Sequence, residues 1–408
     1  MNNRLTIKEK SFIVITFFYI AYTIFPLFAD TTGIPVYIPA MALVASLFMM
    51  YPKAFWGEST KCFIVYIGVL LLYTVLGKPI FINGLSRSLS PIYRIIIESA
   101  WILPNITIMN VLLYKNDKRL YQIVGYGSIV LLVASFLYIL PLVGSSTNIL
   151  REDMEGVASI RPIGLPGYDL MHAYTLMILP LCLLVKESIG KMRPLFLGLL
   201  LLFAYMITQT AVTTSLVVMT IAVLFTCIFD IRKLLRSVMI ICLFLIVSYV
   251  LNQYGFFLNV VDGLMPYFEG TAVSSKLEDL HTSMVLEQVT GSSLTGRMDY
   301  HQISKDAFWS NPVVGSDRAG GHSKILDLLG SMGLLAFIPY FMILYSSLKR
   351  YAFRLKKDVE LKPYLYFSFL LACVYLYTKG IFGSPGYLFM LVIVPSILIS
   401  INSLNKKK

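Results

Sequence analysis

The sequence predicts an all-α, polytopic membrane protein with about twelve transmembrane helices. Its composition is 57% hydrophobic and only 14% charged, and its mean hydropathy is +0.75. Apolar runs of roughly 17 to 22 residues recur along nearly the whole chain, and each can cross about 30 Å of hydrocarbon as a helix. No hydrophilic stretch is long enough to form a soluble domain, so residues 1–408 are predicted to form a single integral membrane domain.

The predicted spans follow one another along the chain with polar breaks between them. Run 11–28 is predicted as a first transmembrane helix rather than a signal peptide, because it lacks a small-residue cleavage site and another span follows at once. The run from 195 to 229 is divided near Val212, since it is too long for one span. In order, the expected spans are 11–28, 33–50, 62–77, 92–113, 122–143, 171–185, 195–211, 213–229, 238–257, 325–348, 364–382 and 387–403.

The basic residues predict the orientation of these spans. With both termini in the cytoplasm, about 23 lysine and arginine residues face inward and about 11 face outward, as the positive-inside rule requires. Acidic residues are distributed the other way, so the inner face carries nearly all of the net charge of +12. This charge is interpreted as the topology signal of a protein in the cytoplasmic (inner) membrane. Nucleic-acid binding is disfavoured, because no aromatic-interleaved basic patch accompanies the charge.

Two predicted outer loops contain the residues that could carry chemistry. They are the short loop 144–170 and the long loop 258–324, which lies between the ninth and tenth spans. All four histidines fall in these loops or at the outer interface. No DxD pair occurs outside, and the five cysteines lie in apolar runs without CxxC or Cys/His spacing. We therefore expect no metal, no cofactor and no disulfide.

The long loop contains two helical patterns. In the first, Val273, Leu277, Leu280 and Met284 recur at helical spacing, which predicts an amphipathic helix on the membrane surface or over a cleft, or a helix packed on neighbouring spans. The second covers residues 296–311 and ends at an Asn-Pro step.

The second pattern contains a stripe of basic side chains. Arg297, His301 and Lys305 repeat at i, i+4 and i+8, away from the apolar face of the same helix. Such a stripe is commonly a solvated face. Beside a membrane entrance it is also a candidate anion site.

His322 stands directly before the tenth span, after a glycine-rich turn. Ser323 can cap this helix, and the partial positive charge of a helix N-terminus favours a neutral imidazole. A general base requires a neutral imidazole, so His322 is a candidate base; the alternative is a histidine that simply lies at the interface. Arg318 and Lys324 flank it and are further candidates for anion binding.

The short loop offers Arg161, followed by a proline and a glycine, and then Tyr168 and His172 at the start of the sixth span. A rigid proline and a glycine turn suit a backbone held close to a ligand. Arg161 and Tyr168 are therefore candidate binding residues. An ordinary surface arginine is the alternative.

These residues resemble the superfamily of O-antigen and capsular polysaccharide polymerases and O-antigen ligases. The resemblance rests on two ordered motifs: Arg161-Pro162-Ile163-Gly164-Leu165, and the string Gly296-Arg297, Asn311-Pro312, Gly315, His322 and Gly333-Leu334-Leu335. One position departs from the family. Members often carry a Ser-Arg pair where the seventh span turns into the eighth, and this chain has Ser215 without a neighbouring arginine.

The resemblance implies an enzyme whose donor and acceptor are lipid-diphosphate-linked oligosaccharides. A sugar hydroxyl of the acceptor attacks the anomeric carbon of the donor, and the lipid diphosphate leaves. Arg161 and Arg297 would stabilise the leaving diphosphate, because a guanidinium matches phosphate oxygens and stays charged. His322 would accept the hydroxyl proton. Membrane lipid, a flippase and a chain-length regulator are the implied partners, whereas nucleic acid is not.

Within this superfamily a polymerase is expected, because Gly320-Gly321-His322-Ser323 and the Leu-Leu-Gly step after it look more like capsule polymerases. An O-antigen ligase shares the chemistry and is the alternative. Transport, as by a lipid-linked glycan flippase, is the second alternative. Transporters place ionisable residues toward a mid-membrane cavity, and here only Glu98 lies deep within a predicted span.

Overall fold

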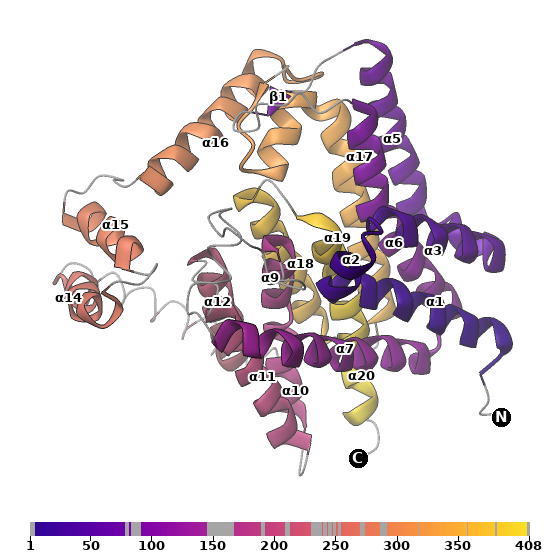
Figure 1. The fold of residues 1–408 in the computed structure, drawn as a ribbon, viewed down its shortest axis with the longest axis horizontal. Helices are drawn as coiled ribbons and strands as arrows, with labels where there is room; N and C mark the ends of the chain where they lie inside the picture. Colours follow the sequence, from indigo (N-terminus) through magenta and orange to yellow (C-terminus); the bar gives the residue numbers. More distant parts are fainter. Residues whose placement is uncertain are drawn as a thin grey trace.

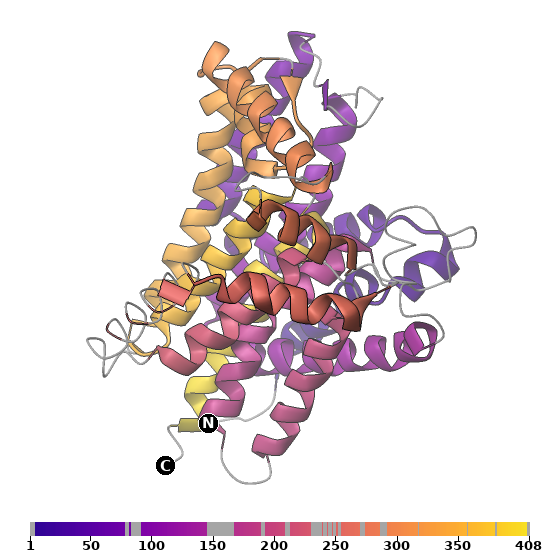
Figure 2. The same ribbon diagram turned by 90° about the vertical axis from the view of Figure 1, so that its left-hand side faces the viewer.

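The computed structural model shows a predominantly helical protein (Figures 1 and 2). It describes the chain except residues 1–4, 78–80, 83–90, 145–166, 189–191, 209–212, 230–238, 240–242, 244–246, 248–249, 252–253, 270–273, 286–291, 317, 357, 380–381 and 406–408. The predicted all-α class is confirmed for the described residues, whose strands are limited to one short parallel pair.

The elements, in chain order, are α1 (Ile7–Ile24), α2 (Pro26–Thr32), α3 (Tyr37–Met50), α4 (Pro52–Phe55), α5 (Glu58–Val75), β1 (Phe81–Ile82), α6 (Pro91–Lys115), α7 (Lys118–Gly144), α9 (Tyr168–Leu176), α10 (Ile178–Glu187), α11 (Met192–Thr208), α12 (Thr213–Ile228), α14 (Phe256–Leu264), a 3₁₀ turn (Met265–Phe268), α15 (Ser274–Val285), α16 (Ser292–Ser310), β2 (Arg318–Ala319), α17 (Lys324–Arg354), α18 (Lys362–Thr378), α19 (Gly383–Leu388), a π-helical turn (Phe389–Ile393) and α20 (Val394–Asn405).

Six helices among the described residues are long and apolar enough to cross a membrane, and a seventh is added if a sharply bent pair counts as one span. The six are Glu58–Val75, Ile95–Lys115, Lys118–Pro141, Asp169–Glu187, Lys324–Arg354 and Gly383–Ile401. Shorter apolar helices cover three further predicted spans, at Tyr37–Met50, Met192–Thr208 and Thr214–Ile228. The expected ninth span, 238–257, lies mostly outside the described residues. The total of about twelve spans stays a prediction.

The first expected span is not one straight helix. The chain bends by 85° between α1 and α2. Phe25, at the bend, has φ −121° and ψ 88°, outside the helical region. Proline disfavours the helical region for the residue before it and has no N–H to continue the ladder, so Pro26 accounts for the break.

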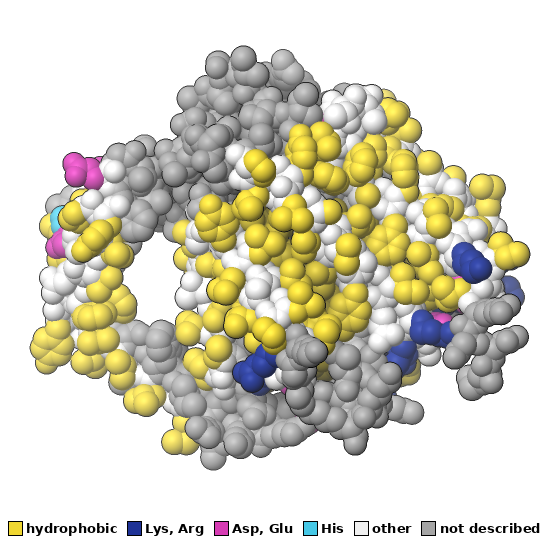
Figure 3. All heavy atoms as spheres, turned by 60° about the horizontal axis from the view of Figure 1, so that its bottom comes forward, with side chains coloured by type: hydrophobic (Ala, Val, Ile, Leu, Met, Phe, Trp, Pro, Cys, Tyr) yellow, Lys and Arg dark blue, Asp and Glu magenta, His cyan; other side chains and the backbone are white. Residues whose placement is uncertain are grey.

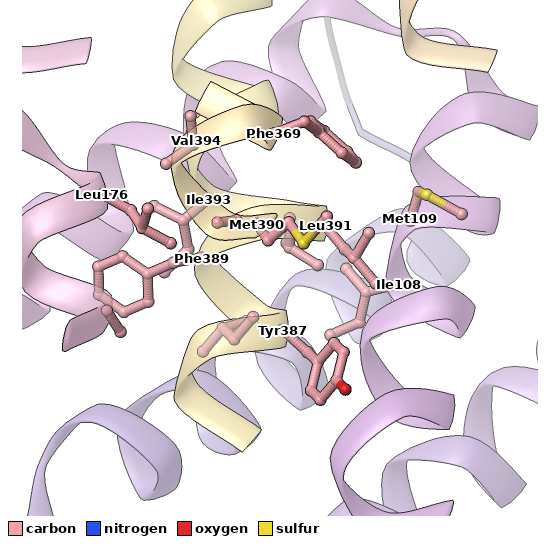
Figure 4. Packing of buried hydrophobic residues seen from close by; sticks show 14 of the residues in the cluster. Ile108, Met109, Leu176, Phe369, Tyr387, Phe389, Met390, Leu391, Ile393 and Val394 are labelled. Carbon is pink, nitrogen blue, oxygen red and sulfur yellow. The ribbon is translucent and has the colours of Figure 1, made fainter. Parts of the chain in front are cut away.

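The C-terminal span is the most buried of the six, with 94% of its apolar window inside the protein. Figure 4 shows Leu391 and Met390 of this span packed near Ile108 and Met109 of α6. A π-helical turn interrupts the span just before Pro395, which cannot donate to the carbonyl of Leu391. The Tyr351 hydroxyl donates to that carbonyl at 2.6 Å, so the buried acceptor keeps a partner.

Contacts between helix ends agree with the predicted topology. Lys115 pairs with Glu9 at 3.2 Å, and the Lys186 ammonium reaches the Phe229 carbonyl at 3.3 Å and the Tyr364 hydroxyl at 3.4 Å. All five of these residues belong to helix ends predicted to face the cytoplasm. Which membrane holds the protein, and on which side the termini lie, stay predictions.

The outer surface of the helices is strongly apolar. Figure 3 shows hydrophobic side chains over much of one face, with basic side chains in only a few places on it. Leu201 on α11 is 62% exposed, Ile338 on α17 is 54% exposed and Leu370 on α18 is 56% exposed. Apolar surface of this extent is unfavourable in water and favourable against lipid, as expected for a membrane protein.

Helices α14 and α15 lie side by side at the edge of the molecule (Figures 1 and 2). The pair is joined by His281 and Asp262, whose Nε2 and Oδ1 atoms are 3.1 Å apart. Helix α15 covers Leu277, Leu280 and Met284 of the predicted amphipathic helix, whereas Val273 lies outside the described residues. A lid function for it stays a prediction.

Candidate functional site

The segment with the strongest motif folds at one end of the molecule, where α16 packs against the first turns of α17 (Figure 1). Two glycines allow the close approach. A Cβ atom on Gly320 would lie 1.9 Å from the Tyr300 carbonyl oxygen, and one on Gly330 would lie 2.6 Å from that of Ser304. Only glycine fits at such distances, so Gly320 allows the His322 turn, and Gly330 allows α17, to reach the backbone of α16.

The turn that contains His322, residues 320–323, is held by the carboxylate of Asp327. Its Oδ1 accepts the Ser304 hydroxyl at 2.7 Å and the Gly321 N–H at 3.0 Å, and its Oδ2 accepts the Ser323 N–H at 3.1 Å. The Gly320 N–H donates to the Ser304 hydroxyl at 2.8 Å. Hydrogen bonds to a charged acceptor are stronger than neutral ones, so both sides of His322 are fixed. We name this the Asp327 clamp.

Ser323 caps α17, as predicted. Its backbone is extended and its hydroxyl accepts the Leu326 N–H at 3.1 Å. The cap satisfies one of the free N–H groups that every helix start exposes. His322 therefore precedes a capped helix N-terminus.

Helix α17 breaks at Gly333, where the sequence predicted an uninterrupted span. Gly333 has φ 63° and ψ −164°, a left-handed conformation that suits glycine. The break leaves the N–H groups of Leu334 and Leu335 without helical acceptors, and these donate to the carbonyls of Pro312 at 2.9 Å and Val313 at 3.0 Å. The Asn-Pro segment after α16 is thus bonded into the break in α17.

Tyr73 of α5 secures the same junction from the other side. Its hydroxyl oxygen lies 2.9 Å from the Val314 carbonyl oxygen and 2.8 Å from that of Met332. Its single proton therefore lies between two carbonyl acceptors. The motif positions Asn311-Pro312, Gly315 and Gly333 form one packed unit in space, and Tyr73 completes it.

Three of the predicted site residues have exposed side chains at this end: His322, Arg318 and Lys305. The ring of His322 lies against that of Tyr300, with centroids 4.4 Å apart and planes tilted by 38°. Arg318 lies in β2, in parallel register with Phe81 of β1. His301 is half-buried, with its ring 5.5 Å from that of Tyr377.

The structure does not describe the side chains of three predicted site residues, Arg297, Arg161 and Tyr168. Arg297 lies on α16, but its side chain is outside what the structure describes. Arg161 lies outside the described residues altogether. Tyr168 begins α9, and its side chain is likewise outside them. The proposed meeting of Arg161 with Arg297 stays a prediction.

Lys324 has a buried side chain that is paired with Glu98 of α6. Its ammonium is also 6.0 Å from the centroid of the Tyr340 ring. The sequence placed Glu98 deep within a span and Lys324 among the anion-binding candidates. The sequence contained no signal that Glu98 and Lys324 are in contact. Direct binding of an anion by Lys324 stays a prediction.

A second polar cluster lies around His172, which is 3% exposed. Its Nδ1 is 3.0 Å from the Ser215 hydroxyl, and the Tyr375 hydroxyl donates to the same oxygen at 3.3 Å. The rings of His172 and Tyr375 are 4.9 Å apart. Ser215, the serine without a neighbouring arginine, therefore has histidine and tyrosine as partners.

The last turn of α18 connects these groups, and sequence reasoning missed it. Tyr375 reaches Ser215, Tyr377 lies against His301, and the Lys379 carbonyl accepts the Lys324 N–H at 2.9 Å. Nothing in the sequence spacing of Tyr375, Tyr377 and Lys379, which occupy every second position, indicates a contact with residues 50 or more positions away. Only the packing of α18 against α17 and α9 brings them to the site.

The arrangement offers an exposed imidazole on a fixed turn, beside an aromatic ring and near exposed cations. A neutral imidazole so placed can accept a proton from a hydroxyl group. Among the residues that the structure describes, no group of three or more His, Cys, Asp or Glu side chains is placed to hold a metal ion. Models of known protein families and curated proteins gave no match to this chain.

Proposed function

We propose that this protein polymerises lipid-diphosphate-linked oligosaccharide repeat units into a surface polysaccharide, such as a capsule, an exopolysaccharide or O-antigen, at the outer face of the cytoplasmic membrane. The observation that carries the proposal is the Asp327 clamp, which presents an exposed His322 at the end of a bundle of apolar helices. The family resemblance of this segment supplies the reaction class.

In the proposed reaction the oxygen of an acceptor hydroxyl bonds to the anomeric carbon of the donor sugar. The bond from that carbon to the lipid diphosphate breaks, and its electron pair leaves on the diphosphate oxygen. His322 accepts the hydroxyl proton, which is worth roughly 10²–10⁴ in rate for a positioned base. Arg161, Arg297 and Arg318 are the proposed cations for the charge that grows on the leaving group. His301, Lys305 and Tyr168 are proposed substrate contacts.

The rigidity of the site supports this assignment over transport. Donor and acceptor must be held in a reactive geometry, and a misplacement of about 1 Å can cost on the order of 10² in rate. The backbone contacts at Gly320 and Gly330 and the bonds of Asp327 provide such rigidity. A transporter requires large movements about a central site instead. An O-antigen ligase remains the second candidate, because it would use the same groups for the same bond.

Purified protein in lipid nanodiscs, incubated with a synthetic lipid-diphosphate repeat unit, tests the proposal. A ladder of products that differ by one repeat unit is expected on gel electrophoresis. His322→Ala should slow ladder formation by roughly 10²–10⁴. His281→Ala in α15 is the matched histidine control and should form the ladder at the parent rate. Transfer of a preformed chain to an acceptor lipid without a ladder would indicate a ligase, and no new glycosidic bond with either acceptor would contradict the proposal.

A further inference from the structure

We propose that the buried ion pair between Glu98 and Lys324 is a positioning device that sets where His322 stands relative to the helix bundle. Both side chains are almost fully buried, at 2% exposure for Glu98 and 9% for Lys324. Glu98 belongs to α6, and Lys324 is the first residue of α17, two residues after His322. The proposal deepens the proposed function, and only the activity measurement below rests on that function.

A net gain in stability does not explain why an ion pair is buried here. Removing two charges from water costs several kcal/mol per ion, and the attraction between them repays this only with good geometry, so such pairs rarely add net stability. In a membrane protein, ionisable residues within a span are costly and tend to have a functional role. Only one residue, Ser323, separates Lys324 from the candidate base His322 along the chain.

Two further contacts locate Lys324. Its N–H donates to the Lys379 carbonyl at the end of α18. Its ammonium lies over the ring of Tyr340, whose hydroxyl is 2.7 Å from that of Tyr387 on α19. The start of α17 is therefore held against α6 and against the end of α18. The Asp327 clamp then transmits that location to His322, because Gly321 and Ser323 are bonded to the same carboxylate.

The same two helices are linked a second time, at their other ends, by Arg350 of α17 and Asn110 of α6. This link lies near the far end of α17, whereas Lys324 is its first residue. It offers a matched control: Arg350→Met removes a polar connection between α6 and α17 but leaves the His322 end intact. If the ion pair serves only to hold α6 to α17, the two changes should have similar effects.

The experiment follows the position of residue 322 directly. In protein whose five native cysteines are replaced by alanine, His322→Cys is reconstituted in nanodiscs and its labelling rate with a polar maleimide is measured. Glu98→Gln/Lys324→Met is added to remove both charges together, so that neither is left buried and unpaired. Charge reversal, Glu98→Lys/Lys324→Glu, is the rescue variant. Folding is checked by monodisperse elution in mild detergent.

We expect the double neutral variant to fold and to label several-fold faster or slower than the parent, whereas Arg350→Met labels at the parent rate. Charge reversal should return the rate toward the parent. In protein that retains His322, the double neutral variant should lower kcat on the order of 10²-fold with little change in the donor KM, because misplacement acts on the reacting groups.

A double neutral variant with unchanged labelling and turnover would overturn the positioning role. So would a double variant that does not fold, since the pair would then be needed for the fold as a whole. A raised donor KM with unchanged labelling would also overturn it and would assign Lys324 to the substrate directly. A parent protein without polymerase activity would refute the proposed function, and the labelling rates would still decide the positioning role.

Discussion

Asp327 is predicted to control the rigidity of the His322 turn, and the effect can be estimated from its bonds. The carboxylate accepts two N–H donors and one hydroxyl. A hydrogen bond to a charged group contributes about 1.5–3 kcal/mol. A backbone N–H that loses such a bond should open more readily by the same amount, which is about 10- to 100-fold in the opening equilibrium.

Hydrogen exchange of the amides of Gly321 and Ser323, followed by mass spectrometry in nanodiscs, measures this directly. Asp327→Ala removes both acceptors, so both amides should exchange about 10- to 100-fold faster. Asp327→Asn keeps one oxygen, which can still accept from Ser304 and Gly321, but it places an amide NH₂, which cannot accept a hydrogen bond, opposite the Ser323 N–H. Its effect should therefore be intermediate and concentrated at Ser323.

Asp306→Asn is the matched control on the neighbouring helix. Asp306 is exposed and accepts a bond from Gln302, at 2.7 Å, without touching the His322 turn. Its exchange pattern at Gly321 and Ser323 should match the parent. Unchanged exchange at these amides in Asp327→Ala would refute the clamp, and equal effects of alanine and asparagine at position 327 would refute the assignment of individual oxygens.

Three further predictions concern the same region. Gly320→Ala should lower the thermal stability and displace α16, because its Cβ would lie 1.9 Å from the Tyr300 carbonyl oxygen. Gly198→Ala is the control and should be neutral, since nothing lies within 4 Å of a Cβ atom there. The melting temperatures of the detergent-solubilised proteins compare the two variants. Tyr73→Phe removes the hydroxyl donor shared by the Val314 and Met332 carbonyls and should cost about 1–3 kcal/mol of stability. A melting temperature equal to that of the parent would contradict the bonding at this junction. His322→Ala should lower turnover by roughly 10²–10⁴ while donor binding is retained; turnover near the parent value would remove His322 as the base.

The sequence was sufficient to predict the long apolar helices and the Ser323 cap, but not the breaks within helices. Hydrophobic periodicity located α5, α6, α7 and α17 because each presents a long apolar run. Ser323 was predictable as a cap since capping depends on local chemistry. The break at Gly333 was not, because a glycine inside an apolar run is compatible with a helix, and its left-handed conformation depends on carbonyls supplied by Pro312 and Val313.

The residues of the candidate site also divide into those that the sequence predicted and those that only the structure showed. The motif residues around His322 were found because they are close in sequence and polar in an apolar chain. Asp327, Ser304 and the last turn of α18 were missed, because their roles are contacts made only by folding. Glu98 lies between these cases. Its burial was predictable from its place within a span, whereas its partner was not.

Three contacts between distant parts of the chain meet at the end of α18. The end of α18 touches the Ser215 cluster through Tyr375, α16 through Tyr377 and the start of α17 through Lys379. About 1.5 Å of rise per residue separates these contacts by roughly 6 Å along α18. A change at Ser215 can therefore reach Lys324 through one helical turn. Tyr375→Phe removes the hydroxyl bond to Ser215 and leaves the ring, so it tests whether the His172 cluster is coupled to His322: a coupled cluster should alter the labelling rate of His322→Cys, and an independent one should leave it unchanged.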